Sequence, residues 1–212
     1  KGVRAGDCKY FDYNNDGDIT DDDRMYVGKV TPDIYGGITS TMNWKNFDLS
    51  IFCQFAAGGK ILSAWKGCGG TEGTEHLGLD SEQFYNISKY AANHYWRGEG
   101  TSNTVPRPTL AGTFTGGFGN NLVSTRYLED ASYFKFKTIT LGYSLPHSLL
   151  SKIHVTGARI FVSLDNFFTL TKYSGYDPEF SYESNPTGNS YGADFGEQAT
   201  LKSFIIGASI NF

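Results

Sequence analysis

Hydrophobic and polar residues alternate along five stretches of the chain, as expected for β-strands with one apolar face. These stretches lie at about 34–44, 47–57, 132–145, 157–168 and 201–212. Only Lys45 and Asn46 separate the first two stretches, and a two-residue connection between alternating segments predicts a hairpin. The pattern therefore predicts five antiparallel strands.

The third stretch changes parity along its length. Ile139, Leu141 and Tyr143 share one face, whereas Phe134 and Phe136 have the opposite parity. This change predicts either a β-bulge that shifts the register or a strand whose upper part rises out of the apolar band.

Short and long connections alternate between the predicted strands. The short ones are Lys45-Asn46 and about 146–156, and the long ones are 58–131 and 171–200. Short turns on one side and long loops on the other are typical of an outer-membrane β-barrel. We therefore expect three extracellular segments, which are 1–33, 58–131 and 171–200. Trp44 would then lie in an aromatic belt at the periplasmic end of its strand.

Composition favours the same fold class and excludes several functions. Charged residues make up 19% of the chain, aromatic residues 16%, and 26 residues are glycine, which together favour an all-β protein. A formal net charge of −4 argues against nucleic-acid binding. Five strands cannot close a barrel, and open strand edges cannot lie in lipid. We therefore expect the chain to be the C-terminal part of a longer polypeptide that supplies the remaining strands.

Residues 12–23 read DYNNDGDITDDD, which matches the twelve-residue calcium loop D-x-[DN]-x-[DN]-G. Gly17 would permit the sharp turn, and Ile19 occupies the apolar eighth position. The candidate ligands of a structural Ca²⁺ are Asp12, Asn14, Asp16, Asp18 through its carbonyl, and Asp23. Asp23 departs from the usual glutamate at position twelve. The alternative is a polar turn that holds no metal.

Four segments of the chain resemble the late-barrel region of SusC/RagA-type TonB-dependent transporters. They are GDCKYFDYNNDGDITDDDRMYVGKVTPDIYGGITSTMNWKNFDLSIFCQF, YLEDASYFKFKTITLGYSLP, ARIFVSLDNFFTLTKYSGYDPEF and SFIIGASINF, in the order found in the family. The resemblance implies strands from a 22-stranded transmembrane antiparallel β-barrel with long extracellular loops, a size class whose lumen holds a plug. Independently of this family, Phe212 ends an alternating strand, and such an end resembles the signal read by the outer-membrane assembly machinery. The alternative is that Phe212 is merely an apolar terminus.

The same resemblance implies function and partners. Family members lie in the outer membrane of Bacteroidetes-type Gram-negative bacteria, take energy from TonB and import oligosaccharides or peptides. A SusD-like surface lipoprotein covers the barrel. The plug and the TonB-contacting segment are N-terminal in the family, so the N-terminal remainder of the same transporter would be a partner of this chain, together with outer-membrane lipid.

Aromatic residues in the predicted outer loops are candidates for stacking on a sugar or peptide ligand. They are Trp65, Trp96, Tyr173, Tyr176, Tyr182 and Tyr191. Such residues also pack within their own loops or against the lipoprotein. A helix is predicted over 80–96, with Asp80 and Gln83 as a capping box.

No catalytic constellation emerges from the sequence, and we expect no enzymatic activity. Asp177 and Glu179 flank Pro178 without an identifiable cleft, and the four histidines are far apart without a Ser or Cys motif. Cys8, Cys53 and Cys68 form no CxxC pair, so zinc is not expected, and either three free thiols or a Cys8–Cys68 disulfide remain open. The alternative function is a secreted β-sandwich carbohydrate-binding module with a calcium loop, whose strands would turn their apolar faces inward.

Overall fold

A computed structural model describes residues 3–66, 78–79, 87–110, 120, 122–151, 155–179, 192–196 and 198–212. The chain divides into two compact units. Unit 1 comprises Lys1–Gly28, Ile61–Glu129 and Ser181–Gly196, and unit 2 comprises Lys29–Lys60, Asp130–Phe180 and Glu197–Phe212.

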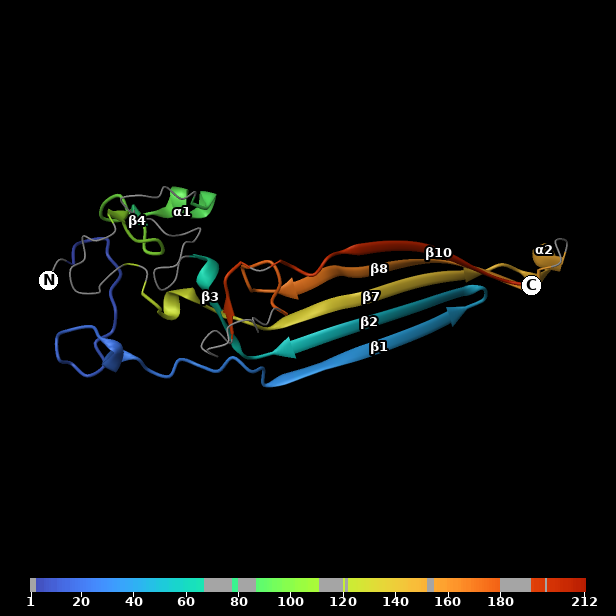
Figure 1. Cartoon of the computed structure of the whole chain (residues 1–212), viewed down its shortest axis with the longest axis horizontal. Coiled ribbons are helices and arrows are strands. Elements are labelled where there is room, and N and C mark those ends of the chain that lie inside the picture. Colours follow the sequence, from blue (N-terminus) through green and yellow to red (C-terminus); the bar gives the residue numbers. More distant parts are fainter. Residues whose placement is uncertain are drawn as a thin grey trace. The chain divides into compact units, whose positions relative to one another are not determined.

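Unit 2 is built on a five-stranded antiparallel sheet in the order β1-β2-β7-β8-β10 (Figure 1). The strands are β1 (Ile34–Trp44), β2 (Phe47–Ala57), β7 (Tyr133–Ser144), β8 (Gly157–Thr171) and β10 (Ser203–Asn211). β1 and β2 have the predicted bounds, whereas β8 continues three residues further than predicted. The all-β class is confirmed. The strands are 9 to 15 residues long, well beyond the roughly 5–6 residues common in globular proteins.

The two-residue connection of β1 and β2 is formed by Lys45 and Asn46. Lys45 has a φ of +52°, the left-handed conformation that a tight hairpin turn requires, and its Nζ lies 4.7 Å from the centre of the Trp44 ring. The short helix α2 (His147–Leu150) follows β7 at the same end of the sheet (Figure 1).

A β-bulge explains the change of parity along β7. Phe52 of β2 pairs with Thr138, but the next β2 residue, Cys53, pairs with Phe136, so Lys137 is the extra residue. The insertion restores the parity of Phe134 and Phe136, which therefore lie on the same face as Ile139, Leu141 and Tyr143. The bulge, rather than a strand that leaves the apolar band, is the correct interpretation.

Unit 1 contains short elements that the alternation pattern does not reveal. Its strands form a three-stranded sheet, β6-β3-β9, and a two-stranded sheet, β4-β5. The strands are β3 (Lys60–Ser63), β4 (Gly78–Leu79), β5 (Thr109–Leu110), β6 (Leu128–Asp130) and β9 (Ala193–Asp194). The helical turns are η1 (Asp21–Asp23), η2 (Ala64–Lys66), α1 (Lys89–His94) and η4 (Thr125–Tyr127). Ala64 and Tyr127 form a small buried cluster with Leu62 packed against it.

The helix predicted over 80–96 is wrong as one continuous element. Ser88 has an extended backbone and its Oγ accepts a hydrogen bond from the Ala91 backbone N–H, so α1 begins at Lys89. Tyr95 is extended again and ends α1 at His94. Asp80 and Gln83 lie outside the described residues.

The structure also describes two of the three cysteines and the helices of the chain. Cys8 and Cys53 are free thiols, and Cys68 lies outside the described residues. Within the part of the chain that the structure describes, no helix is both long enough and apolar enough to cross a membrane.

Candidate functional site

One face of the five-stranded sheet, here called the apolar face, collects the apolar side chains of all five strands. The register aligns them row by row, for example Leu49 with Leu141, Leu141 with Val162, and Val162 with Ile206. The apolar-face residues are Ile34, Ile38, Met42 and Trp44 on β1, Phe47, Leu49, Ile51, Cys53 and Phe55 on β2, Phe134, Phe136, Ile139, Leu141 and Tyr143 on β7, Ile160, Val162, Leu164, Phe168 and Leu170 on β8, and Phe204, Ile206, Ala208 and Ile210 on β10.

The apolar face is largely exposed. Ile160, Ile206 and Ile210 are 50%, 66% and 55% exposed, and Leu49, Ile51 and Val162 are half-buried. A β-sandwich would bury these side chains in a two-layer core. None of these six side chains, all of which the structure describes, is buried. This finding argues against the β-sandwich alternative, which predicted an inward-facing apolar core.

Aromatic side chains gather at both ends of the apolar face. At the hairpin end, the Phe47 ring lies 6.3 Å from Trp44 and 4.7 Å from Tyr143, centre to centre. At the opposite end, the Phe136 ring lies 5.4 Å from Phe134 and 6.2 Å from Phe168. Aliphatic residues fill the rows between the two aromatic groups.

The opposite face, here called the polar face, carries an ion pair that crosses a strand. Arg159 of β8 donates to Asp48 of β2 through Nε (2.9 Å) and Nη2 (2.5 Å). The guanidinium passes over Gly142 of the intervening β7, where an added Cβ would lie 2.4 Å from both Arg159 Nη2 and Asp48 Oδ1. A side chain at position 142 would therefore collide with the ion pair, and glycine avoids this collision. Further along, Thr140 and Ser163 hydroxyls are 3.0 Å apart.

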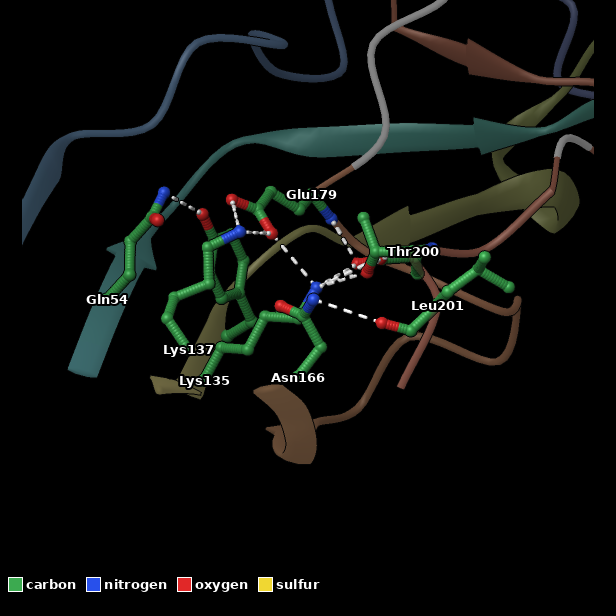
Figure 2. A network of polar contacts seen from close by, with 9 residues as sticks. Gln54, Lys135, Lys137, Asn166, Glu179, Thr200 and Leu201 are labelled. Atoms are coloured by element: carbon green, nitrogen blue, oxygen red, sulfur yellow. Dashed lines mark hydrogen bonds and ion pairs between the residues drawn. The ribbon is translucent and has the colours of Figure 1, made fainter. Parts of the chain in front are cut away.

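The polar face also carries a buried ionic network near the bulge (Figure 2). Lys135 of β7 is 1% exposed, and its Nζ donates to both carboxylate oxygens of Asp177 (3.1 and 2.9 Å), to Glu179 Oε2 (2.9 Å) and to Thr200 Oγ1 (2.8 Å). Lys137, the bulge residue, donates to both carboxylate oxygens of Glu179 at 2.8 Å. Thr200 Oγ1 in turn donates to Asp177. Two cations and two carboxylates thus neutralise one another.

The network ties the segment after β8, which we call the strap (Lys172–Glu179), to β7. Burial raises the pKa of the Asp177 carboxyl, but hydrogen bonds from Thr200, Lys135 and the Glu179 backbone outweigh it and hold the pKa below its ordinary value. Burial likewise raises the pKa of Glu179, and its bonds to Lys137 and Lys135 outweigh that effect. Both carboxylates are therefore ionised at neutral pH, when the network is complete.

From the sequence, Asp177 and Glu179 are considered only as a catalytic pair, which is rejected, and their ionic bonds to Lys135 and Lys137 are not predicted. Lys135 has the parity of the polar face only because the bulge at Lys137 shifts the register. The one available signal was the Lys-x-Lys pair next to the parity change. Nearby, Gln54 donates to the Tyr133 hydroxyl (3.1 Å), and Asn166 donates to the Leu201 carbonyl (3.1 Å), as Figure 2 shows.

The loop over residues 12–23 curls as its sequence suggests. The Asp12 carboxylate accepts hydrogen bonds from the backbone of Asp16 (3.2 Å) and Gly17 (2.9 Å), and Gly17 has a φ of +86°. Asp23 is buried and accepts from the backbone of Thr20 and Tyr13, bonds that lower its carboxyl pKa.

The loop does not bring enough acidic groups together to define a metal site by itself. Asn14 Nδ2 donates to Asp16 Oδ2 (2.7 Å), and Asp16 Oδ1 accepts from the Asp18 backbone (2.8 Å). Over the described residues, no three His, Cys, Asp or Glu side chains are grouped closely enough to hold a metal ion. The loop is therefore curled around the Asp12 carboxylate, and its carboxylates accept hydrogen bonds from backbone N–H groups.

The predicted aromatic ligand residues do not form one cluster. Tyr173 is 6% exposed and Tyr176 is 82% exposed, both in the strap of unit 2. Trp65 and Trp96 are half-buried in unit 1, where the Trp96 ring covers Gly6. Two further candidates lie outside the described residues, namely Tyr182 and Tyr191.

The fold and its two faces are typical of one class of protein. The sheet is antiparallel with long strands, and one face is apolar, exposed and bordered by aromatic side chains, while the other face is polar. These are the features of the wall of a transmembrane β-barrel.

Comparison with known proteins identifies relatives of this class. The chain is 30% identical over 209 residues to TonB-dependent receptor P3 of Formosa agariphila, and 24% identical over 205 residues to TonB-dependent receptor SusC of Bacteroides thetaiotaomicron. Each alignment covers 96% of this chain but only 19% and 17% of the relative. The chain is thus a homologue of TonB-dependent receptors and spans about a fifth of their length. No family model matches it.

Solved structures show the same fold. A structure of the RagAB peptide transporter has a TM-score of 0.68 and 23% identity, covering 92% of this chain and 19% of that chain. The RagAB peptide importer in its closed-closed state has a TM-score of 0.66 and 24% identity. The resemblance to SusC/RagA-type transporters that the sequence motifs indicate is confirmed.

Proposed function

We propose that this chain forms part of the barrel wall of a TonB-dependent outer-membrane importer of oligosaccharides or peptides. The carrying observation is the exposed apolar face, which is continuous over five strands and ends at aromatic side chains on both sides. Lipid would cover this face, and the polar face would line the lumen. The rest of the same transporter would supply the plug, the TonB-contacting segment and the strands that complete a 22-stranded barrel.

The height of the apolar face supports the membrane assignment. Phe134 and Tyr143 mark its two ends on β7 and pair with Phe55 and Phe47 on β2, which are eight residues apart because β2 lacks the bulge residue. At about 3.3 Å per residue and a tilt of about 40°, the two ends are separated by about 20 Å along the membrane normal. The apolar band of an outer-membrane barrel is about 25 Å tall.

The relatives support import as the function: RagAB, whose structures share this fold, is a peptide importer, and SusC is a homologue of this chain. From the resemblance to SusC/RagA-type transporters we also infer a SusD-like surface lipoprotein as the partner and a location in a Bacteroidetes-type outer membrane. In this assignment the chain transports and does not catalyse a reaction.

Growth of the native bacterium tests the proposed function. An in-frame deletion of the gene that encodes this chain should abolish growth on at least one oligosaccharide or peptide pool supplied as the sole carbon source. Deletion of the gene for the proposed SusD-like lipoprotein and loss of TonB should give the same defect. Unchanged growth of the deletion strain on neutral oligosaccharides and on peptides alike would contradict the proposal.

We also propose that residues 12–23 bind a structural Ca²⁺. The support is the ligand spacing, the left-handed Gly17 and the curled backbone around the Asp12 carboxylate. The ligands would be Asp12, Asn14, Asp16, Asp18 and Asp23, a set of hard oxygen donors. Binding of Ca²⁺ would require the carboxylates to give up their present hydrogen bonds with backbone N–H groups and to turn toward the ion.

Calorimetric titration of Ca²⁺ into the full-length transporter tests this site. Asp12→Asn should weaken binding at least tenfold, because it removes a charged ligand at the first position of the loop. Asp22→Asn is the matched control, since Asp22 is exposed in the same loop but occupies no ligand position. If the wild-type protein binds no Ca²⁺ at millimolar Ca²⁺ concentrations, the proposed calcium site is contradicted.

Phe212 remains the proposed assembly signal. It follows β10 and is 90% exposed, and it continues the alternation of Ile206, Ala208 and Ile210.

A further inference from the structure

We propose, building on the import function above, that the strap presents Tyr176 as a fixed stacking surface for neutral sugar rings. Lys135 is the positioning residue that holds the strap in place. Three features support this role: the strap is anchored on either side of Tyr176, the Tyr176 ring is exposed, and the charges of the neighbouring network are paired.

The first anchor lies before Tyr176 and is made by packing. Tyr173 is 6% exposed, its backbone N–H donates to Thr171 Oγ1 (3.1 Å), and that hydroxyl donates to the Ser132 carbonyl (2.8 Å). Gly175 lies against the Tyr173 ring so closely that an added Cβ would be 2.4 Å from the ring carbon Cε1. Only glycine fits there, so the backbone immediately before Tyr176 is held against a buried ring.

The second anchor lies after Tyr176 and is ionic (Figure 2). Asp177, the next residue, is 9% exposed and is bound by Lys135 and Thr200. Its Oδ1 also accepts from the Glu179 backbone (3.1 Å), across the buried Pro178, whose ring fixes the backbone angle φ. The strap is therefore tied down within one residue of Tyr176 on one side and three residues on the other.

Tyr176 itself is 82% exposed between these anchors. A large amphipathic ring on an ordered backbone is suited to binding, because a tyrosine side chain has only two rotatable bonds to fix and the backbone is already ordered. An exposed tyrosine on an unanchored segment would lose more conformational entropy when it binds.

The charge balance favours an uncharged ligand. Lys135, Lys137, Asp177 and Glu179 pair with one another, so this network presents two positive and two negative charges that are already satisfied. A peptide would need partners for its charged termini, whereas a neutral sugar ring offers a C–H face to an aromatic ring and hydroxyls to polar groups. We therefore assign a neutral oligosaccharide to this position.

The test uses the complete transporter with its lipoprotein partner, isolated from the native outer membrane. The probes are a pool of neutral oligosaccharides from partial hydrolysis of starch, agarose and mannan, and a pool of tryptic casein peptides. Mass spectrometry identifies what the wild-type complex captures, and calorimetry gives the affinity. Wild-type capture of neutral oligosaccharides is expected, and capture of peptides alone overturns the assignment.

The variants separate the ring from its support. Tyr176→Ala should weaken oligosaccharide binding about three- to tenfold, the range expected for loss of one aromatic contact, while Tyr176→Phe should bind nearly as wild type. Tyr26→Ala is the matched control for the loss of an exposed tyrosine ring, because Tyr26 is also 82% exposed. The affinity of this variant should be unchanged.

Lys135→Met should weaken binding to the same degree as Tyr176→Ala, and the double variant should be no weaker than either alone. Because the single Lys135 variant can fail to assemble, the charge-exchanged pair Lys135→Asp with Asp177→Lys is included and should recover affinity. Equal binding by Tyr176→Ala and wild type, or additive losses in the double variant, overturns the proposal. If the wild-type strain imports its substrate and Tyr176→Ala binds normally, this inference fails while the import function stands.

Discussion

Replacing Lys135 with methionine should raise amide hydrogen exchange in the strap and at Thr200 about a hundredfold, which corresponds to about 3 kcal/mol of local stability. The reason is the burial of its partners. Lys135 is 1% exposed, and without its ammonium Asp177 and Glu179 would be close together with too little positive charge between them. Removing one member of a buried ion pair costs more than removing both, because the remaining charge has no partner.

Lys137→Met is the control for this experiment. The Lys137 side chain is 24% exposed and bonds only to Glu179 within the network, so its loss should raise exchange far less. Replacing both Lys135 and Asp177 by apolar residues should recover part of the protection. The comparison is made by mass spectrometry on peptides from the full-length protein in detergent. Exchange in Lys135→Met as slow as in the wild type would show that the network does not hold the strap.

The same network predicts how the stability of the strap depends on pH. The pKa values of Asp177 and Glu179 are lowered in the folded protein, so their contribution to stability is fully present above the ordinary carboxyl pKa values of 3.8 and 4.5. It is lost as the pH falls through the lowered folded values. Strap protection should therefore be constant between pH 8 and about pH 5.

The strands of unit 2 could be predicted because each is a long alternating segment with a polar break on either side. β1 and β2 match their expected bounds, since the two-residue turn at Lys45 and Asn46 leaves the register no freedom. The β7 bulge was visible as a parity change, but parity alone could not choose between a bulge and a departure from the apolar band. Pairing with β2 decides it, because Cys53 faces Phe136.

The ionic network and unit 1 could not be predicted for a different reason. Lys135 meets Asp177 across 42 residues, and no local pattern links a strand to a segment that far away. Strands of two residues, such as β4 and β9, are too short to show alternation. The helix predicted over 80–96 fails because Ser88 caps a shorter helix, a role that its hydroxyl takes only in an extended backbone.

The central claim is that lipid covers the apolar face, and two neighbouring isoleucines test it. Ile206 lies on the apolar face of β10 and is 66% exposed, whereas Ile205 lies on the polar face and is 46% exposed. An arginine on the lipid face of a barrel costs about 2–4 kcal/mol near the bilayer midplane, while lumen positions tolerate charge. The two positions share strand, wild-type residue and substituted residue, so only the face differs.

The measurement is the amount of folded, heat-modifiable full-length barrel in the outer membrane, compared for Ile206→Arg, Ile205→Arg and wild type. We predict that Ile206→Arg lowers this amount at least fivefold, whereas Ile205→Arg stays close to wild type. Equal levels for the two variants, or a greater loss for Ile205→Arg, would show that the apolar face does not lie against lipid and would contradict the account.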